Sequence, residues 1–151
     1  MKESKFEIIP MGFVERSELL ADGEASRKQE ATIRIEPSFL ACCEGIEELS
    51  HALVIWWAHE RESKRFDIQK VQPKGRKDLP FIGLFCTRSP VRPNPLCTDI
   101  VEILSFEGNA LVVTGLDAHR GTPVLDIKGW YASVPDEEVK KPGWYKKLTK
   151  E

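Results

Sequence analysis

Short runs of apolar residues, each about the length of a β-strand, follow one another along most of the chain. Residues 31–36 (ATIRIE) alternate between apolar and polar positions, as a strand with one buried face does. Residues 51–59 (HALVIWWAH) are rich in β-branched and aromatic side chains and are the best candidate for a central strand. Residues 6–14 (FEIIPMGFV) predict an edge or bulged strand, since Pro10 interrupts the run. Residues 81–87 (FIGLFCT) predict one more strand.

The second half of the chain carries a β-hairpin signal. Two strand-like runs, residues 99–105 (DIVEILS) and 110–115 (ALVVTG), flank the turn sequence Phe-Glu-Gly-Asn at 106–109. The Gly-Asn pair can adopt the left-handed backbone conformations that tight hairpins need. Residues 122–128 (TPVLDIK) predict a further strand after this hairpin.

One segment between the predicted strands favours a helix instead. Residues 37–49 (PSFLACCEGIEEL) predict a short helix with its N-cap near Ser38 and a break at Gly45. Many short strands with few short helices are typical of a mainly β fold, and they predict a small closed or nearly closed antiparallel β-barrel. A chain of 151 residues fits one domain. We expect the barrel domain at 1–135 and a charged C-terminal tail at 136–151.

Composition narrows the class of protein. No apolar run is long enough to cross a bilayer, and the first ten residues carry four charged side chains, unlike a signal peptide. The four cysteines include no C-x-x-C pair. We therefore expect a cytoplasmic protein with no membrane partner and no metal. Neither G-x-G-x-x-G nor G-x-x-x-x-G-K-[ST] occurs, so the standard nucleotide-binding loops are excluded.

The net charge of −2 hides an uneven distribution. Between Arg61 and Arg92 there are nine Lys and Arg residues and only three Asp and Glu residues. Such a run is usually a solvated loop, which charge alone favours. It could also be a patch that binds phosphate or RNA.

The segment TRSPVRPNP (87–95) holds three prolines and two arginines directly after a predicted strand. Prolines at alternate positions fix φ and remove backbone donors, so the segment should be stiff and extended. Arg88 and Arg92 could bind carboxylate or phosphate groups through paired hydrogen bonds. A rigid connector with solvated arginines explains the same composition equally well.

A second polar segment, LDAHRGTP (116–123), lies between the last two predicted strands. Gly121 permits a close backbone approach or an unusual φ, and Asp117 and Thr122 offer polar atoms beside it. An ordinary Asp/Gly turn would look the same. His59, at the end of the most apolar strand, could be either a functional side chain or a strand-end histidine.

The two polar segments together resemble the TrmO family, also called YaeB-like proteins. The hallmark sequences of that family read approximately TRS-x-x-RPNP-[IL]-G and LD-[LM]-x-[DN]-GTP-[VI]-[LV]-DIKPY, which TRSPVRPNP and LDAHRGTPVLDIK match. The resemblance covers about residues 5–131. It implies a dimeric methyltransferase on a small β-barrel that uses S-adenosylmethionine without a Rossmann domain. The family substrate is tRNA, at N6 of the threonylcarbamoyl-adenosine beside the anticodon.

Carried over position by position, the resemblance implies a set of site residues. The cofactor contacts would be Arg27, Lys28, Gln29, His59, Glu60, Arg88, His119, Arg120, Gly121 and Thr122. The candidates for a catalytic base are Asp117, Asp126 and His59. For a tRNA substrate, Lys74, Arg76 and Lys77 of the basic run would bind phosphates by their charge, and Arg92 and Asn94 would contact the substrate at the floor of the site.

Two departures from the family pattern keep other functions open. Cys97 stands where the family has glycine, and Arg120 replaces the usual acid or amide before Gly-Thr-Pro. Both positions fall in the expected pocket. A methyltransferase with a different RNA or a small-molecule acceptor is therefore one alternative, and a non-catalytic RNA-binding barrel is another.

Overall fold

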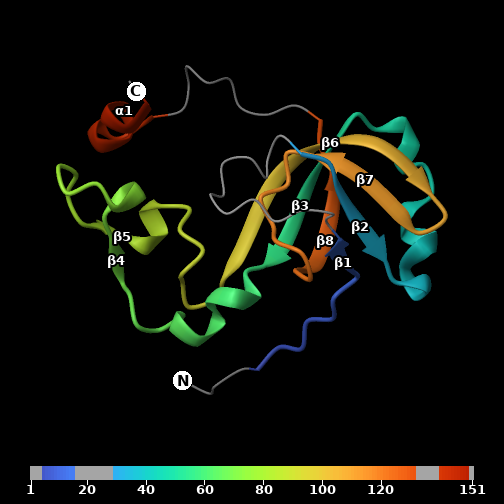
Figure 1. Ribbon diagram of the computed structural model, residues 1–151, viewed down its shortest axis with the longest axis horizontal. Coiled ribbons are helices and arrows are strands. Elements are labelled where there is room, and N and C mark those ends of the chain that lie inside the picture. The colour runs from blue at the N-terminus through green and yellow to red at the C-terminus, as the bar shows by residue number, and fades with distance from the viewer. Residues whose placement is uncertain (1–4, 16–28, 132–139, 150–151) are drawn as a thin grey trace. The chain divides into compact units, whose positions relative to one another are not determined.

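The computed structural model describes residues 5–15, 29–131 and 140–149. Six strands close into an antiparallel barrel in the order β1-β2-β7-β6-β3-β8, with β8 paired back to β1 (Figure 1). These strands are β1 (Gly12–Glu15), β2 (Ala31–Ile35), β3 (His51–Trp57), β6 (Leu96–Glu107), β7 (Ala110–Thr114) and β8 (Pro123–Gly129). The predicted closed antiparallel β-barrel is confirmed.

Side chains along the barrel strands alternate between the interior and the exterior. On β3, Val54 and Trp56 are buried, whereas the residues next to each of them point to the other face and are half-exposed. On β2, the same alternation buries Ile33 and Ile35 completely. Each large apolar side chain in such a core contributes about 1.5–3 kcal/mol relative to an exposed one. The period of two in the sequence therefore reflects the two faces of the barrel wall.

The β6–β7 hairpin is confirmed, with Gly108 and Asn109 as its turn. Gly108 has φ 63, in the left-handed region that favours glycine. The Asn109 side-chain amide donates to the Ile35 carbonyl oxygen at 3.1 Å, which ties the turn to β2. Strand β6 begins at Leu96, earlier than predicted, because its first residues pair with the end of β3.

The edge strand expected at 6–14 is shorter than predicted. Strand β1 begins at Gly12, where pairing with both β2 and β8 starts. Ahead of it, the Met11 backbone N–H donates to the Val124 carbonyl oxygen at 2.8 Å. The apolar run before Met11 therefore contributes no strand, and Phe6 is 86% exposed.

The single helix expected at 37–49 is replaced by two 3-10 helices, η2 (Pro37–Cys43) and η3 (Ile46–Glu48). The predicted break is confirmed, because Gly45 adopts φ 83 between them. The predicted cap at Ser38 is wrong. Glu36 is the N-cap, since proline suits the first helical position, where no backbone donor is needed.

A second compact unit comprises Glu60–Pro95 and Tyr131–Glu151, while Met1–His59 and Leu96–Trp130 form the barrel unit. The elements of the second unit are η4 (His59–Lys64, which begins on the last residue of the barrel unit), β4 (Lys70–Val71), η5 (Pro73–Gly75), β5 (Ile82–Gly83), η6 (Leu84–Cys86) and α1 (Gly143–Thr149). Strands β4 and β5 form a two-stranded antiparallel sheet. The boundary that we expected between residues 135 and 136 lies outside the described residues.

The strand expected at 81–87 is wrong beyond its first residues. Only Ile82–Gly83 pairs as a strand, and the chain then turns into η6. The Leu84 N–H donates to the Gln69 carbonyl oxygen at 3.0 Å, and the Leu84 carbonyl accepts from the Thr87 hydroxyl at 2.9 Å. These bonds fix a turn that the apolar composition does not reveal. Within the described part of the chain, no helix has the length and apolar character needed to span a membrane.

Candidate functional site

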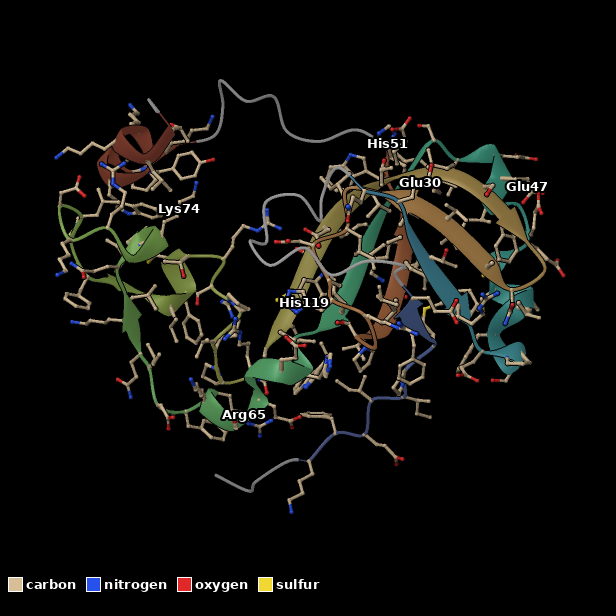
Figure 2. All side chains as sticks on the ribbon, viewed as in Figure 1. Glu30, Glu47, His51, Arg65, Lys74 and His119 are labelled. Atoms are coloured by element: carbon tan, nitrogen blue, oxygen red, sulfur yellow. The ribbon has the colours of Figure 1, made fainter. Side chains whose placement is uncertain are left out.

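One end of the barrel gathers polar residues from segments far apart in the sequence. Strand β3 ends where β6 and β8 begin, because Trp57 pairs with Leu96 and Trp56 pairs with Val124. His59 follows β3 at this end, and the loop from Gly115 to Thr122, here called the β7–β8 loop, leads into the start of β8 there. His119, labelled in Figure 2, belongs to this loop. The structure therefore brings His59 and the β7–β8 loop to the same end of the barrel.

Backbone hydrogen bonds fix the far end of the β7–β8 loop to β1. The Gly121 N–H donates to the Val14 carbonyl oxygen at 2.8 Å, and the Val14 N–H donates to the Thr122 carbonyl oxygen at 3.0 Å. Gly121 has φ 82, and a Cβ there would meet no atom within 4 Å. Thr122 is 1% exposed, whereas His119 is exposed. The loop thus holds its backbone rigidly while leaving open space beside Gly121.

His59 carries an unsatisfied polar atom. Its Nδ1 is buried and has no hydrogen-bond partner among residues 5–15, 29–131 and 140–149. A buried polar atom without a partner costs about 1–3 kcal/mol, so such atoms are rare and point to a missing ligand or water. The position of this nitrogen, two residues past β3, makes it a ready contact for a bound molecule.

The three candidate bases lie in different surroundings. Asp117 is half-buried in the β7–β8 loop, at the same barrel end as His59. Asp126 lies further along β8, opposite Ile55, and its carboxylate forms an ion pair with Lys128 at 2.6 Å. Asp117 therefore belongs to the loop between β7 and β8, where its backbone N–H bonds Asp99, whereas Asp126 lies within β8 beside Lys128.

A buried carboxylate that the sequence analysis missed supports the β7–β8 loop. Asp99 of β6 is 6% exposed, and its Oδ2 accepts hydrogen bonds from Trp56 Nε1 at 2.9 Å and from the Asp117 backbone N–H at 3.0 Å. The sequence offered one signal, which is a charged residue at an inward position of a strand.

Charged groups flank the same barrel end. The pKa of the Glu15 carboxyl lies below its usual range, first because of the hydrogen bonds from Arg34 and also because of the positive charges of Arg34 and Arg120. Gln29 is half-buried and stands just ahead of β2, which starts at this end. Arg27 and Lys28 lie outside the described residues. Arg120 is exposed to solvent, and its positive charge also helps to stabilise the ionised carboxylate of Glu15.

The second unit holds the remaining predicted site residues. They are Glu60, Lys74, Arg76, Lys77, Arg88, Arg92 and Asn94. Arg92 Nη1 donates to the carbonyl oxygens of Thr87 and Ser89, at 3.3 and 3.2 Å. These bonds bracket Arg88, whose side chain is exposed. Arg92 therefore shapes the rigid proline-rich loop that presents Arg88.

The basic run of the second unit contains paired and unpaired cations. Arg76 binds Asp78 through two hydrogen bonds, at 3.0 and 2.6 Å, which hold the pKa of Asp78 below its usual range. Lys74 (labelled in Figure 2) and Lys77 are exposed and make no ion pair with the described residues. The unit as a whole has 14 Lys and Arg against 8 Asp and Glu, a net charge of +6.

The barrel unit has the opposite charge. It contains 8 Lys and Arg against 16 Asp and Glu, a net charge of −8. No group of three or more His, Cys, Asp or Glu side chains in the described ranges is placed to hold a metal ion. The excess of positive charge that the sequence shows between Arg61 and Arg92 is therefore a property of one structural unit.

Fold and site together define a closed six-stranded β-barrel with a polar end built from β3 and the β7–β8 loop. Residues 8–136 match the family model of the tRNA-methyltransferase O N-terminal domain, and the chain belongs to this family. The resemblance noted in the sequence is confirmed.

Several relatives and solved structures resemble this chain. A probable S-adenosyl-L-methionine-binding protein of Methanothermobacter thermautotrophicus is 37% identical over 139 residues, which are 89% of this chain and 96% of the relative. A protein of the same description from Pyrococcus horikoshii is 35% identical over 85% of both chains. A crystal structure of TrmO matches with a TM-score of 0.68 at 24% identity, over 90% of this chain. TrmO from Pseudomonas aeruginosa matches with a TM-score of 0.65 at 25% identity, over 88% of this chain. The match spans about three fifths of these TrmO chains, 61% and 60%.

Proposed function

We propose that this protein transfers a methyl group from S-adenosylmethionine to N6 of the threonylcarbamoyl-adenosine beside the anticodon of a tRNA. Membership of the tRNA-methyltransferase O family supports the reaction class, and the description of the relatives as S-adenosyl-L-methionine-binding supports the cofactor. The observation that carries the proposal is the convergence of His59 and the β7–β8 loop at one end of the barrel.

The residues at this end fit S-adenosylmethionine. The buried and unpartnered Nδ1 of His59 can hydrogen-bond the polar edge of an adenosyl or methionyl group. The space beside Gly121 admits a ligand close to the backbone. The family resemblance separately assigns Arg88 to the cofactor, and its exposed guanidinium suits a carboxylate. When bound, S-adenosylmethionine supplies an electrophilic methyl carbon on a positively charged sulfur.

The task of the protein residues is then alignment and proton handling. In the transfer a carbon–sulfur bond breaks as a nitrogen–carbon bond forms, and the acceptor nitrogen loses its proton. Holding the reacting atoms roughly 3–3.5 Å apart supplies much of the acceleration. Asp117 and His59 are the favoured proton acceptors because they belong to the β7–β8 loop and to the residues that follow β3, the two segments assigned to the cofactor.

The charge of the second unit supports an RNA acceptor. A local net charge of +6 attracts a polyphosphate chain although the whole protein is negative. Lys74 and Lys77 are exposed cations of the basic run that can contact phosphates. Exposed Phe66, Phe81 and Phe85 of the same unit offer rings on which unpaired bases can stack.

We also propose a cytoplasmic homodimer. The family resemblance supports dimerisation, and so do apolar side chains on the outer face of β3 and β6, where exposed Leu96 and Ile100 lie opposite Trp57 and Leu53. The tRNA acceptor supports the cytoplasmic location. Sedimentation at micromolar protein tests the dimer, and a species of 17.2 kDa, with and without cofactor, would contradict it.

Two measurements test the proposed function. Calorimetry with S-adenosylmethionine and S-adenosylhomocysteine tests the cofactor, and we expect binding of both. Mass spectrometry of nucleosides from the tRNA of a deletion strain tests the acceptor, and we expect the N6-methylated threonylcarbamoyl-adenosine to disappear. Reintroducing the wild-type gene should restore it, and Asp117→Asn should restore less.

The alternatives predict different outcomes. Cofactor binding with an unchanged tRNA would indicate another acceptor. RNA binding without cofactor binding would indicate a non-catalytic RNA-binding barrel, and would overturn the proposal.

A further inference from the structure

Asp99 is a charged residue at a position where the barrel wall otherwise points apolar side chains inward. It pairs with Val54 across β6 and β3, and both residues are buried. An aspartate is seldom buried unless its carboxylate is satisfied by strong donors. Here Trp56 Nε1 and the Asp117 backbone N–H both donate to the same oxygen, Oδ2. Asp99 is therefore a fixed acceptor inside the barrel end.

Through its Oδ2 atom, Asp99 links β6, the strand that carries it, to β3 and to the β7–β8 loop. Trp56 belongs to β3 and lies three residues before His59, while Asp117 lies two residues before His119 in the β7–β8 loop. Close backbone packing fixes the start of that loop as well. A Cβ on Gly115 would stand 3.0 Å from the Ile100 carbonyl oxygen of β6. The loop thus leaves β7 pressed against β6 and is then held by the Asp99 side chain.

We propose that Asp99 is a positioning residue for the cofactor site. It sets the separation between the end of β3, which carries His59, and the β7–β8 loop, which carries His119 and Gly121. The inference rests on the proposed function, because the two segments that it aligns are those assigned to S-adenosylmethionine. Asp99 acts through Trp56 and Asp117 and does not itself touch the ligand.

The donor set explains why a carboxylate suits this position. Both donors are neutral N–H groups that need an acceptor, and a carboxylate oxygen accepts more strongly than an amide oxygen. Asparagine could keep one oxygen in place for both donors, with weaker bonds. Alanine leaves both donors without an acceptor inside the barrel. The series Asp, Asn, Ala at position 99 therefore grades the alignment without changing a residue that touches the cofactor.

The experiment uses the full chain and the variants Asp99→Asn, Asp99→Ala and Trp56→Phe. The matched control is Glu102→Gln, which changes an exposed carboxylate of the same strand on the outer face of the barrel. Calorimetry measures the affinity for S-adenosylhomocysteine. Nuclear magnetic resonance measures the indole N–H signal of Trp56, assigned by its absence in Trp56→Phe, and the exchange of the loop amides 117–122.

We expect Asp99→Ala to weaken S-adenosylhomocysteine binding by about tenfold or more, with Asp99→Asn intermediate, as lost bonds to a charged acceptor imply. The Trp56 indole signal should move and the loop amides should exchange faster in Asp99→Ala. Glu102→Gln should match the wild type in all three readouts. If Asp99→Ala does not fold, Trp56→Phe serves instead, with about a threefold loss of affinity expected from one missing donor.

Two results separate failure of this proposal from failure of the proposed function. Wild-type affinity and wild-type loop exchange in folded Asp99→Ala, or unchanged affinity in Trp56→Phe if Asp99→Ala does not fold, would overturn the positioning role. A lower melting temperature with unchanged affinity would leave Asp99 a purely structural residue, and would also overturn it. If the wild-type protein does not bind S-adenosylhomocysteine, the proposed function fails and the cofactor role of Asp99 fails with it. Faster loop exchange would then still establish the tie between Asp99 and the loop.

Discussion

Removing two exposed lysines of the second unit should change how tRNA binding depends on salt. Lys74 and Lys77 make no ion pair with the described residues, so each can neutralise one phosphate. Each phosphate contact contributes a slope of about −0.7 to −0.9 to the logarithm of affinity against the logarithm of salt. The double variant Lys74→Ala/Lys77→Ala should therefore lose about 1.4 to 1.8 of that slope. At roughly 0.1 M salt this corresponds to about 25- to 60-fold weaker binding.

Arg76 provides the internal comparison for the lysine pair. Its guanidinium is bound by Asp78 at 2.6 Å, so contacting a phosphate would require that ion pair to break. Arg76→Ala should therefore change the salt slope by much less than the double lysine variant does. Lys5→Ala, an exposed lysine of the barrel unit, is the matched control and should leave the slope unchanged.

The assay is fluorescence anisotropy with labelled tRNA across about 50 to 200 mM salt, the range over which counterion release dominates. Calorimetry with S-adenosylhomocysteine should show the same cofactor affinity in wild-type and variant proteins. An unchanged salt slope in a folded Lys74→Ala/Lys77→Ala protein would refute the assignment of these lysines to the RNA. A small-molecule acceptor would be favoured if methyl transfer also survived the double substitution.

Three further predictions concern stability and reactivity. Gly12→Ala should unfold the barrel far more readily than Gly121→Ala, because its Cβ would stand 2.5 Å from a backbone oxygen of β2; Gly121→Ala should cost only about 1–2 kcal/mol of left-handed strain in urea denaturation. The lowered pKa of Glu15 means that the Glu15–Arg34 pair stabilises the fold above the unfolded-state pKa of glutamate and is lost as pH falls through the folded-state value. Glu15→Gln should therefore flatten the acid limb of the stability curve, and a variant with a curve identical to the wild type would contradict this. Burial raises the pKa of the Cys43 thiol, so a thiol reagent should modify the two exposed cysteines first and Cys43 only after unfolding.

The parts of the fold that local patterns encode could be predicted from the sequence. The alternation at 31–36, the β-branched run at 51–59 and the Gly-Asn turn each depend on neighbouring residues, and the structure confirms all three. The apolar run at 81–87 misled because Leu84 alone is buried there, while Phe85 is 84% exposed. Hydrogen bonds to distant residues decide where such a run turns, and a single sequence does not display them.

The site was predictable only in part, for a related reason. Family resemblance joined His59 with the β7–β8 loop, and the strand register shows that they share a barrel end. Asp99 escaped notice because its role depends on which residues of β3 and of the loop lie beside it in space. Asp126 looked equivalent to Asp117 in the sequence, but Asp117 lies in the β7–β8 loop, whereas Asp126 lies within β8 and pairs with Lys128.

The convergence of two donors on one oxygen of Asp99 has a consequence for how this protein can change over time. A substitution at Trp56 removes one donor and leaves the loop amide bound to Asp99, whereas a substitution at Asp99 strands both donors at once. The two changes are therefore not independent, and their free-energy effects should not add in a double-mutant cycle. The residue at position 56 therefore limits which residues position 99 can accept. The hydrogen bond that joins β3 and β6 here can be replaced by another polar contact only if both positions change together.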